Sequence, residues 1–312
     1  MTPIVANFPH SANALPMWVA ADRGLFSKRG LAVAFEEARG SAAQYRGLME
    51  GRIHVFTTLM ENVIAYRWGE GEVQFDPAPD AVAFMGGGLG HQLLMARASI
   101  EDVEGLRGRT LAVSGLRTGN AIVLYGMLSR IGLKRDRDYK VVAVGAGPVT
   151  MESLLHVGAD AALMGAPHDR TAAAGGLRKL GDSLTVFGEY QSSVYTVRRS
   201  WAAAHEEELV ALSAAMIEAH RFVFADRADA IAVLRAHLQT LSPDAAAAVY
   251  GDLVAPHGGL SRDGRILPQN VEVVLQLRRE FAEHPPPPST LSDFCDTRYH
   301  EQAMRLLAKE AS

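Results

Sequence analysis

The order of predicted strands and helices in the first sixty residues occurs again about a hundred residues later. The first run begins with the apolar segment Thr2–Phe8 and the second with Arg109–Ser114. In both, the spacing of apolar residues predicts strand, helix, strand, helix, strand, and glycines such as Gly24 and Gly132 mark helix ends. Strands that alternate with helices form a parallel sheet covered on both faces. The sequence therefore predicts an α/β protein with two similarly built lobes.

The predicted elements of the two lobes have matching lengths. In the first lobe the strands are Thr2–Phe8, Ala32–Glu36 and Ile53–Phe56, and the helices are Leu15–Phe26 and the segment from Ser41, a plausible N-cap, to Gly51. In the second lobe the strands are Arg109–Ser114, Tyr139–Val144 and Ala159–Met164, and the helices are Gly119–Ile131 and Val149–Val157. In such sheets, ligands bind at the carboxyl ends of the strands.

The pattern after about Ala203 is helical only. One buried stripe is formed by Leu209, Leu212, Met216, Ala219 and Val223. Ser242, followed by Pro243, has the pattern of a helix N-cap and N1 residue. The run Pro285–Pro288 predicts a stiff extended spacer before a last helix, in preference to a ligand for an SH3 domain.

Composition excludes several classes of protein. The 31 basic and 35 acidic residues are spread along 312 residues, so no basic surface for nucleic acid is expected. Cys295 is the single cysteine, which rules out an intramolecular disulfide and a thiolate cluster, and we expect it to be packed. The longest apolar runs, such as Lys140–Val144, are strand-sized and far below the roughly 20 residues of a membrane span.

The first twenty residues contain no basic segment followed by an apolar segment, so no secretory leader is expected there. Two locations remain open: the cytoplasm, or the periplasm after removal of a leader.

Five motifs occur in order along the first two thirds of the chain. They are Leu15–Phe26 with Gly30-Leu31, Gly51–Val55, Glu61–Tyr66, Leu106–Val113 and Gly158–Ala162. Together they resemble the sulfonate-, taurine- and thiamine-precursor-binding proteins of bacterial ABC importers, over roughly residues 4 to 200. Each motif alone is a packing or turn signature, and the resemblance rests on their order and spacing.

The resemblance implies the type II periplasmic-binding-protein fold, in which two Rossmann-like lobes are joined by a two-strand hinge. Lobe 1 would hold residues 1–88 and 191–312, and lobe 2 would hold residues 89–190. The chain would cross between them near Gly86–His91 and Gly188–Gln191. We expect a monomer, without cofactor or metal, that captures a small anionic or planar organic ligand for an ABC permease.

The glycine run from Gly86 to Gly90 fits a hinge, because glycine tolerates the dihedral changes of a lobe rotation. A dinucleotide fingerprint would need a third glycine where His91 stands. Two departures from the family are visible: His54 replaces the usual Asp, and the clustered cysteines of the branch that makes the thiamine pyrimidine are missing.

Four strand-to-helix turns should face the cleft, namely Phe8–Asn13, Thr57–Asn62, Ser114–Asn120 and Gly165–Asp169. In the third turn, free N–H groups around Thr118 and Asn120 would favour an anionic group, and Arg117 would add a contact to a carboxylate or sulfonate. The alternative is that Thr118 only caps the helix and Arg117 points into solvent.

The other candidate residues have structural alternatives as well. Thr57, Thr58 and Asn62 match the position from which family members reach the ligand, although Asn62 would also serve as a helix cap. Phe8 and Trp18 would stack on a planar ligand or belong to the core. The remaining candidates are His10 and His168, which would hydrogen-bond a ligand or lie at the surface, and Tyr190 at the second crossing.

No metal-binding spacing involves His156 or His168. The motifs G-x-S-x-G and P-loop lysine are missing as well. A solute-binding protein is therefore the leading hypothesis. The alternatives are an enzyme on the same fold, either decarboxylase-like or pyrimidine-synthase-like, and a cytoplasmic ligand sensor.

Overall fold

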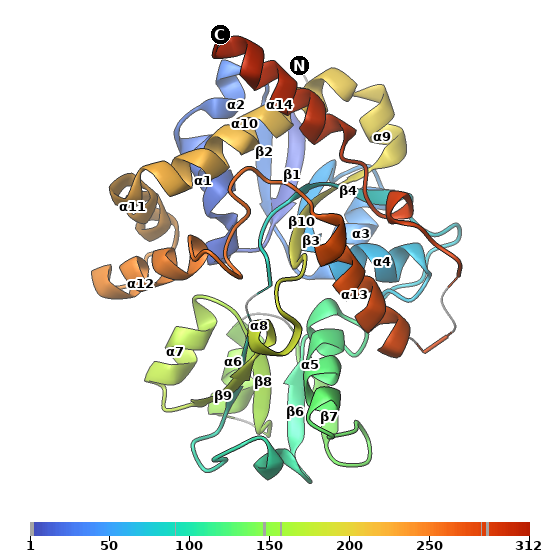
Figure 1. Cartoon of the computed structure of the whole chain (residues 1–312), viewed down its shortest axis with the longest axis vertical. Helices are drawn as coiled ribbons and strands as arrows, with labels where there is room; N and C mark the ends of the chain where they lie inside the picture. Colours follow the sequence, from blue (N-terminus) through green and yellow to red (C-terminus); the bar gives the residue numbers. More distant parts are fainter. Residues whose placement is uncertain (1–2, 91, 146–147, 157, 282, 285–286) are drawn as a thin grey trace.

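Two five-stranded sheets, one in each half of the molecule, organise the computed structural model (Figure 1), which describes residues 3–90, 92–145, 148–156, 158–281, 283–284 and 287–312. The first sheet has the order β2-β1-β3-β10-β4 and consists of β1 (Ile4–Phe8), β2 (Val33–Glu37), β3 (Val55–Leu59), β4 (Ala81–Gly86) and β10 (Ser193–Arg198). The second has the order β7-β6-β8-β5-β9 and consists of β5 (Leu93–Ala96), β6 (Thr110–Val113), β7 (Lys140–Ala143), β8 (Ala161–Met164) and β9 (Arg178–Asp182). The α/β class and the two lobes are as predicted.

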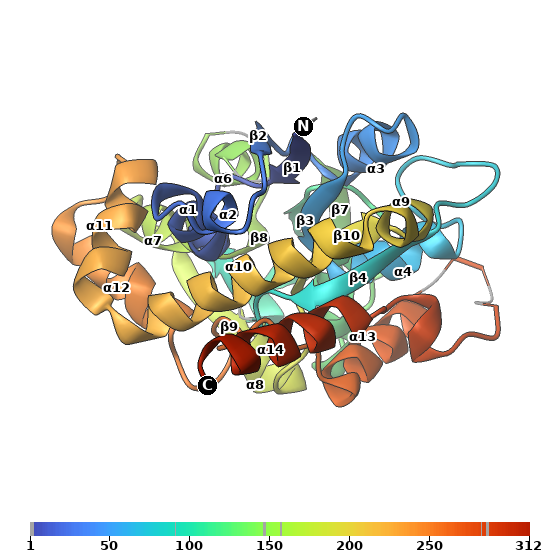
Figure 2. The same cartoon turned by 90° about the horizontal axis from the view of Figure 1, so that it is seen from above.

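Helices surround both sheets. With the first sheet lie α1 (Leu15–Asp22), α2 (Leu25–Lys28), α3 (Ser41–Met49), α4 (Met60–Arg67) and the later helices α9 (Arg199–Ala204), α10 (Glu206–Ala225), α11 (Arg227–His237), α12 (Pro243–Leu253), α13 (Pro268–Phe281) and α14 (Arg298–Glu310). With the second lie α5 (Gly119–Arg130), α6 (Pro148–Leu155), α7 (His168–Ala174) and α8 (Ser183–Phe187). Viewed from above, α10 and α14 lie across the first half of the molecule (Figure 2).

The strands of the two predicted runs pair in parallel, as expected, but each sheet also contains an antiparallel strand from outside these runs. β10 runs antiparallel to β3 and β4, and β5 runs antiparallel to β8 and β9. Both strands follow a crossing between the halves: the chain leaves the first sheet after Gly86 and returns to it at Ser193. A strand that begins at a crossing runs away from the other half, whereas its parallel neighbours run towards it. His91, at the predicted first crossing, lies outside the described residues, and the lobe boundaries 1–88 with 191–312 and 89–190 stay a prediction.

Several predicted ends are shifted. Gly24 has φ of 63° and divides the predicted helix Leu15–Phe26 into α1 and α2. Gly40, not Ser41, is the N-cap of α3, and Ser41 is the first helical residue. Strand β3 extends to Leu59, so Thr57 and Thr58 belong to the strand and not to the turn after it.

The predicted stripe on α10 is confirmed. Leu209, Leu212, Met216, Ala219 and Val223 are all buried and belong to one apolar cluster with α1, α11 and α14. The Ser242 Oγ accepts a hydrogen bond from the Ala245 N–H (3.2 Å), which confirms it as the N-cap of α12. Cys295 is buried, as expected. In the spacer Pro285–Pro288, the first two prolines lie outside the described residues.

None of the helices in the described ranges combines the length and the apolar character that a membrane span requires.

Truncation of Leu212 should destabilise the first half of the molecule, because the side chain is only 1% exposed in a packed cluster. We expect Leu212→Ala to lower the free energy of unfolding by about 2–5 kcal/mol in urea titrations. Glu207→Ala, on the exposed side of the same helix, should cost less than about 1 kcal/mol. Equal effects of the two substitutions would contradict the packing described for α10.

Candidate functional site

A cavity of about 90 Å³ lies between the two halves, where strands of both sheets end. It is lined by residues that follow β1 or end β3 on one side, by residues that follow β8 on the other, and by both crossings. These residues include Asn13, Leu59, Gly165, Asp169, Gly88 and Ser192. The carboxyl ends of parallel strands are the usual place for a ligand in α/β folds. This interlobe cavity is therefore the candidate site.

A smaller and mostly apolar space continues from the interlobe cavity and shares Leu59, Gln92 and Ser192 with it. Tyr190, one of the predicted residues, lines this inner space. Its ring packs against Gly90, where a Cβ atom would lie 2.2 Å from the ring. Its hydroxyl lies 3.3 Å from the Ser183 Oγ, and burial raises the pKa of Tyr190 to about 12. Gly90 must therefore remain glycine for Tyr190 to hold this position.

The turn between β8 and α7 brings Asp169 into the interlobe cavity. The side chain is only 7% exposed, and burial raises its pKa. The neighbouring His168 is half-buried, burial lowers its pKa, and it is not among the residues that line the described cavities. The predicted turn thus lies at the cavity, but Asp169 lines the cavity and the predicted His168 does not.

The predicted anion site at the start of α5 is filled by side chains of the first lobe. The Gly119 N–H donates to the Asn62 Oδ1 (3.1 Å), and the Arg117 N–H donates to the Glu72 Oε1 (2.6 Å). Asn62 was predicted as an alternative to cap the helix that follows its turn. Instead, its side chain accepts a hydrogen bond from the first residue of α5. Two of the N–H groups in the turn that we expected to bind an anionic ligand, those of Arg117 and Gly119, thus have acceptors from the chain.

The side chains of this turn are also engaged within the protein. The Arg117 guanidinium pairs with the Glu283 carboxylate, so it neither faces the interlobe cavity nor points freely into solvent. The Thr118 hydroxyl donates to the Gly115 carbonyl (2.9 Å) and makes no side-chain capping bond. Asn120 accepts a hydrogen bond from the Gln92 Nε2 (2.9 Å) and lines a small separate cavity of about 10 Å³.

A buried cluster of three charged groups lies behind the start of α5. Arg278 of α13 is only 1% exposed, and its Nη1 lies 2.8 Å from the Glu61 Oε1, while its Nε lies 3.6 Å from the Glu70 Oε2. One guanidinium faces two carboxylates, and burial, partly offset by Arg278, raises the pKa of Glu61 to about 7. No sequence pattern predicted this cluster, because Arg278 is more than 200 residues from Glu70 along the chain.

The predicted aromatic residues lie in the core of the first half. Trp18 is 4% exposed and stacks on His237 with 4.7 Å between ring centroids. Phe8 packs edge-on against Trp18 and Phe35. The exposed His10 ring lies 5.6 Å from Trp18, outside the described cavities.

The two threonines and the unusual His54 also have internal partners. Thr57 and Thr58 are buried in β3, and the Thr58 Oγ accepts a hydrogen bond from the Asn62 Nδ2 (3.1 Å). The His54 Nδ1 accepts a hydrogen bond from the Val5 N–H (2.9 Å), and its ring stacks on Trp201. His54 therefore stabilises the end of the first sheet at which β1 and β3 begin. The interlobe cavity lies at the opposite end, where these strands finish.

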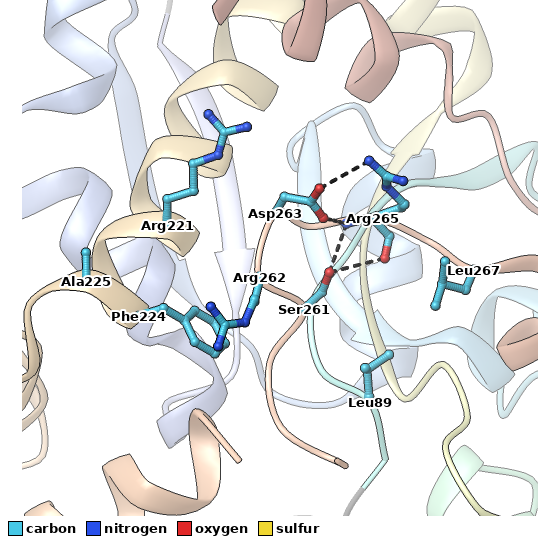
Figure 3. Close-up of a pocket in the computed structure, with 9 residues that line it drawn as sticks. All are labelled: Leu89, Arg221, Phe224, Ala225, Ser261, Arg262, Asp263, Arg265 and Leu267. Carbon is cyan, nitrogen blue, oxygen red and sulfur yellow. Dashed lines mark hydrogen bonds and ion pairs between the residues drawn. The ribbon is translucent and has the colours of Figure 1, made fainter. Parts of the chain in front are cut away.

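A larger pocket of about 640 Å³ lies between α10 and the loop after α12 (Figure 3), and it shares the lining residue Leu89 with the interlobe cavity. Arg221, Arg262, Asp263 and Arg265 line it, and the Arg262 guanidinium lies 4.8 Å from the centre of the Phe224 ring. The pocket is open to solvent, and no residue of a strand-to-helix turn lines it. Size alone therefore does not make it the candidate site.

Within the described ranges, no three His, Cys, Asp or Glu side chains are grouped so that they would hold a metal ion. The sequence missed several residues that do line the interlobe cavity or its inner extension: Asn13, Glu61, Gln92, Asp169, Gln191, Ser192 and Asp252. Asn13, Glu61 and Asp169 lie in turns that were predicted to face the cleft. The sequence therefore indicated the right turns but not these residues within them. The rest come from the crossings or from a helix outside the repeated pattern.

Solved structures with this fold include periplasmic and import-system binding proteins. The periplasmic nitrate-binding protein NrtA from Synechocystis PCC 6803 is 12% identical, with 98% of this chain and 89% of that chain covered and a TM-score of 0.81. The ligand-binding component of an ABC-type import system from Staphylococcus aureus is 13% identical, with 97% of this chain and 99% of that chain covered and a TM-score of 0.79. The aliphatic sulphonate-binding protein SsuA from Escherichia coli is 18% identical, with 90% of each chain covered and a TM-score of 0.67.

An enzyme also has this fold. The desulfurization enzyme DSZB is 15% identical, with 97% of this chain and 99% of that chain covered and a TM-score of 0.61. No curated protein matches the sequence significantly. The model of the NMT1-like family matches residues 7–237, which is well over half of the chain. The chain therefore belongs to the NMT1-like family and has the fold of the periplasmic binding proteins.

Proposed function

We propose that this protein captures a small organic solute between its two lobes and presents it to the permease of an ABC importer. The observation that carries the proposal is the interlobe cavity, which is lined by both lobes and by both crossings. Only a closed arrangement of the lobes assembles such a lining. We further propose that the protein acts in the periplasm as a monomer, with residues 1–88 and 191–312 moving as one body and residues 89–190 as the other.

The two crossings provide a pivot for this movement. The Gly87 N–H donates to the Ser193 carbonyl (2.8 Å), and the Ser192 N–H donates to the Gly88 carbonyl (3.1 Å). The Gly88 N–H donates to the Ser193 Oγ (2.6 Å). Paired segments that contain glycine can change their dihedral angles while they stay together.

Ion pairs join the lobes at both rims of the interlobe cavity. Arg170 of α7 pairs with Asp252 of α12 at one rim, and Arg130 of α5 pairs with Glu280 of α13 (2.8 Å) at the other. These side chains are each about one third to one half exposed, and exposed ion pairs contribute about 0–1 kcal/mol each. Exposed pairs of this kind add little to the stability of the closed form, so a ligand that contacts both lobes would still shift the equilibrium towards it.

Binding without chemistry is the simpler proposal for this lining. Among the described residues, those that line the interlobe cavity and its inner extension include no histidine, cysteine or lysine, and His91, between the lining residues Gly90 and Gln92, lies outside the described part of the chain. The described lining thus supplies none of the usual partners of an activated nucleophile. The fold alone does not decide between a binding protein and an enzyme, so the experiment below includes a test for turnover.

A bound solute should stabilise and compact the protein. We expect thermal-shift screening against sulfonates, aromatic carboxylates, pyrimidines and amines to find a ligand whose stabilisation grows as RT ln(1 + [L]/Kd). Small-angle X-ray scattering should show a smaller radius of gyration with that ligand. Chromatography should recover the ligand unchanged after incubation. Conversion of the ligand, or stabilisation without a change in radius, would contradict capture by closure.

The buried charge cluster predicts a pH-dependent contribution to stability from Glu61. Because the pKa of Glu61 is raised from 4.5 to about 7, the native state binds more protons than the unfolded state between these values. The free energy of unfolding therefore loses up to about 3 kcal/mol from this group as pH rises through that range, and nothing further above it. His220, whose pKa burial lowers to about 4, acts in the opposite direction between pH 4 and 6.5.

Glu61→Gln removes the first effect and leaves the second. We expect the difference in free energy of unfolding, variant minus wild type, to rise between pH 5 and 7.5 in urea titrations. Glu272→Gln, on the exposed face of α13, is the matched control and should give a constant difference. A constant difference for Glu61→Gln as well would show that the buried cluster does not hold a proton near neutral pH.

A further inference from the structure

Two polar side chains that line the interlobe cavity, Asp169 and Gln92, have an oxygen acceptor that lacks a partner in the described part of the chain. Asp169 is more than nine tenths buried and lines the cavity, yet its Oδ1 has no hydrogen-bond partner in the described part of the protein. Leaving a buried carboxylate oxygen unpaired is costly, because the group has lost its water and gained no donor. A ligand that donates to this oxygen would remove the cost.

Two glutamine side chains extend this row of acceptors. The Gln191 Nε2 donates to the Ser193 carbonyl (2.9 Å), which fixes the orientation of the amide and leaves Oε1 without a partner at 1% exposure. The Gln92 Nε2 donates to the Asn120 Oδ1 (2.9 Å), and the Gln92 Oε1 is likewise unpartnered. Gln92 lines both the interlobe cavity and its inner extension, and Gln191 lines the extension. Two of the unpartnered oxygens thus belong to residues that line the interlobe cavity, Asp169 and Gln92, and the third belongs to Gln191 in the adjoining space.

The charged side chains that line the interlobe cavity in the described part of the chain are both carboxylates. The interlobe cavity is lined by the carboxylates of Asp169 and Asp252, and the nearby Arg170 guanidinium is already held by Asp252 and by the Ala248 carbonyl (3.3 Å). Arg170 is not among the lining residues. At the other end of the space, Glu61 and Glu70 share the single guanidinium of Arg278. A cation is favoured in such a field, and an anion is disfavoured.

We propose that the solute is a small organic cation with an ammonium or amidinium group, which donates its N–H bonds to the carboxylate of Asp169. The proposal rests on the proposed function, because it assigns the ligand chemistry of the same cavity. It also explains why the start of α5 has no role in binding an anion: Asn62 and Glu72 occupy those N–H groups. The Gln92 side chain, which lines the same cavity, would supply a second acceptor to the ligand.

Matched probes that differ only in charge test this assignment. The probes are butylamine, butyrate, 1-butanol and butanesulfonate, together with benzylamine and benzoate, each titrated calorimetrically and by thermal shift at pH 7. We expect each amine to bind at least tenfold more tightly than the alcohol or acid of the same skeleton. Asp169→Asn should weaken amine binding at least tenfold, while the variant without ligand should unfold at the same or a higher temperature than the wild type.

The control variant is Glu152→Gln, which changes the same charge at an exposed position of the second lobe. It should bind the amines like the wild type. Preference for butyrate, benzoate or butanesulfonate, with compaction in scattering, would overturn the cation assignment and leave capture by closure standing. Saturable binding of Ca²⁺ or Zn²⁺ that excludes the amines would also overturn it. If no probe binds to the wild type, the cation assignment is contradicted, and capture by closure is decided by the wider thermal-shift screen.

Discussion

The buried guanidinium of Arg278 joins three parts of the chain that the sequence keeps far apart. It pairs with Glu61 in α4, donates to the Glu70 carbonyl (3.0 Å), and donates to the Arg117 carbonyl (3.2 Å) in the turn before α5. A helix from the C-terminal part of the chain thereby connects both lobes at one rim of the interlobe cavity. Loss of one partner from a buried ion pair typically costs 3–5 kcal/mol, because the other charge is left uncompensated. The position of α5, and with it one wall of the interlobe cavity, depends on this contact.

The same contact explains why an attractive anion site is not free. The start of a helix with available N–H groups attracts negative charge, and the first lobe supplies that charge in the form of Glu72, with the amide of Asn62 beside it. The N–H groups at the start of α5 in the second lobe thus bind side chains of the first lobe, and these hydrogen bonds connect the two lobes. Unpartnered acceptors remain on the other side of the cleft, around Asp169. The electrostatic character of the site therefore differs from the one that the turn sequence suggested.

The fold of this family does not restrict ligand chemistry. Binding proteins for nitrate and for aliphatic sulphonates share it, and so does a desulfurization enzyme. Function depends on the residues of the site and not on the fold. Ligand chemistry must therefore be argued from the cavity lining of each chain.

Local patterns were sufficient to predict most of the fold. The spacing of apolar residues and the glycine stops gave the repeated strands and helices, and the buried stripe of α10 was read directly from its periodicity. The four turns at the cleft followed from the rule that strand ends face the ligand, and Asn13, Glu61 and Asp169 do lie in these turns at the interlobe cavity or its inner extension. Such features depend on neighbours within a few residues, which a sequence displays.

Features that depend on contacts between distant segments could not be predicted. The antiparallel direction of β5 and β10 follows from the crossings between lobes, and the burial of Trp18 follows from its stacking on His237 in α11. Arg117 looked free because Glu283 and Glu72 approach it only in three dimensions. The sequence by itself determined which turns line the cleft. Only the tertiary structure decided which of their polar groups remain unpaired, because hydrogen-bond partners come from whatever the fold brings within reach.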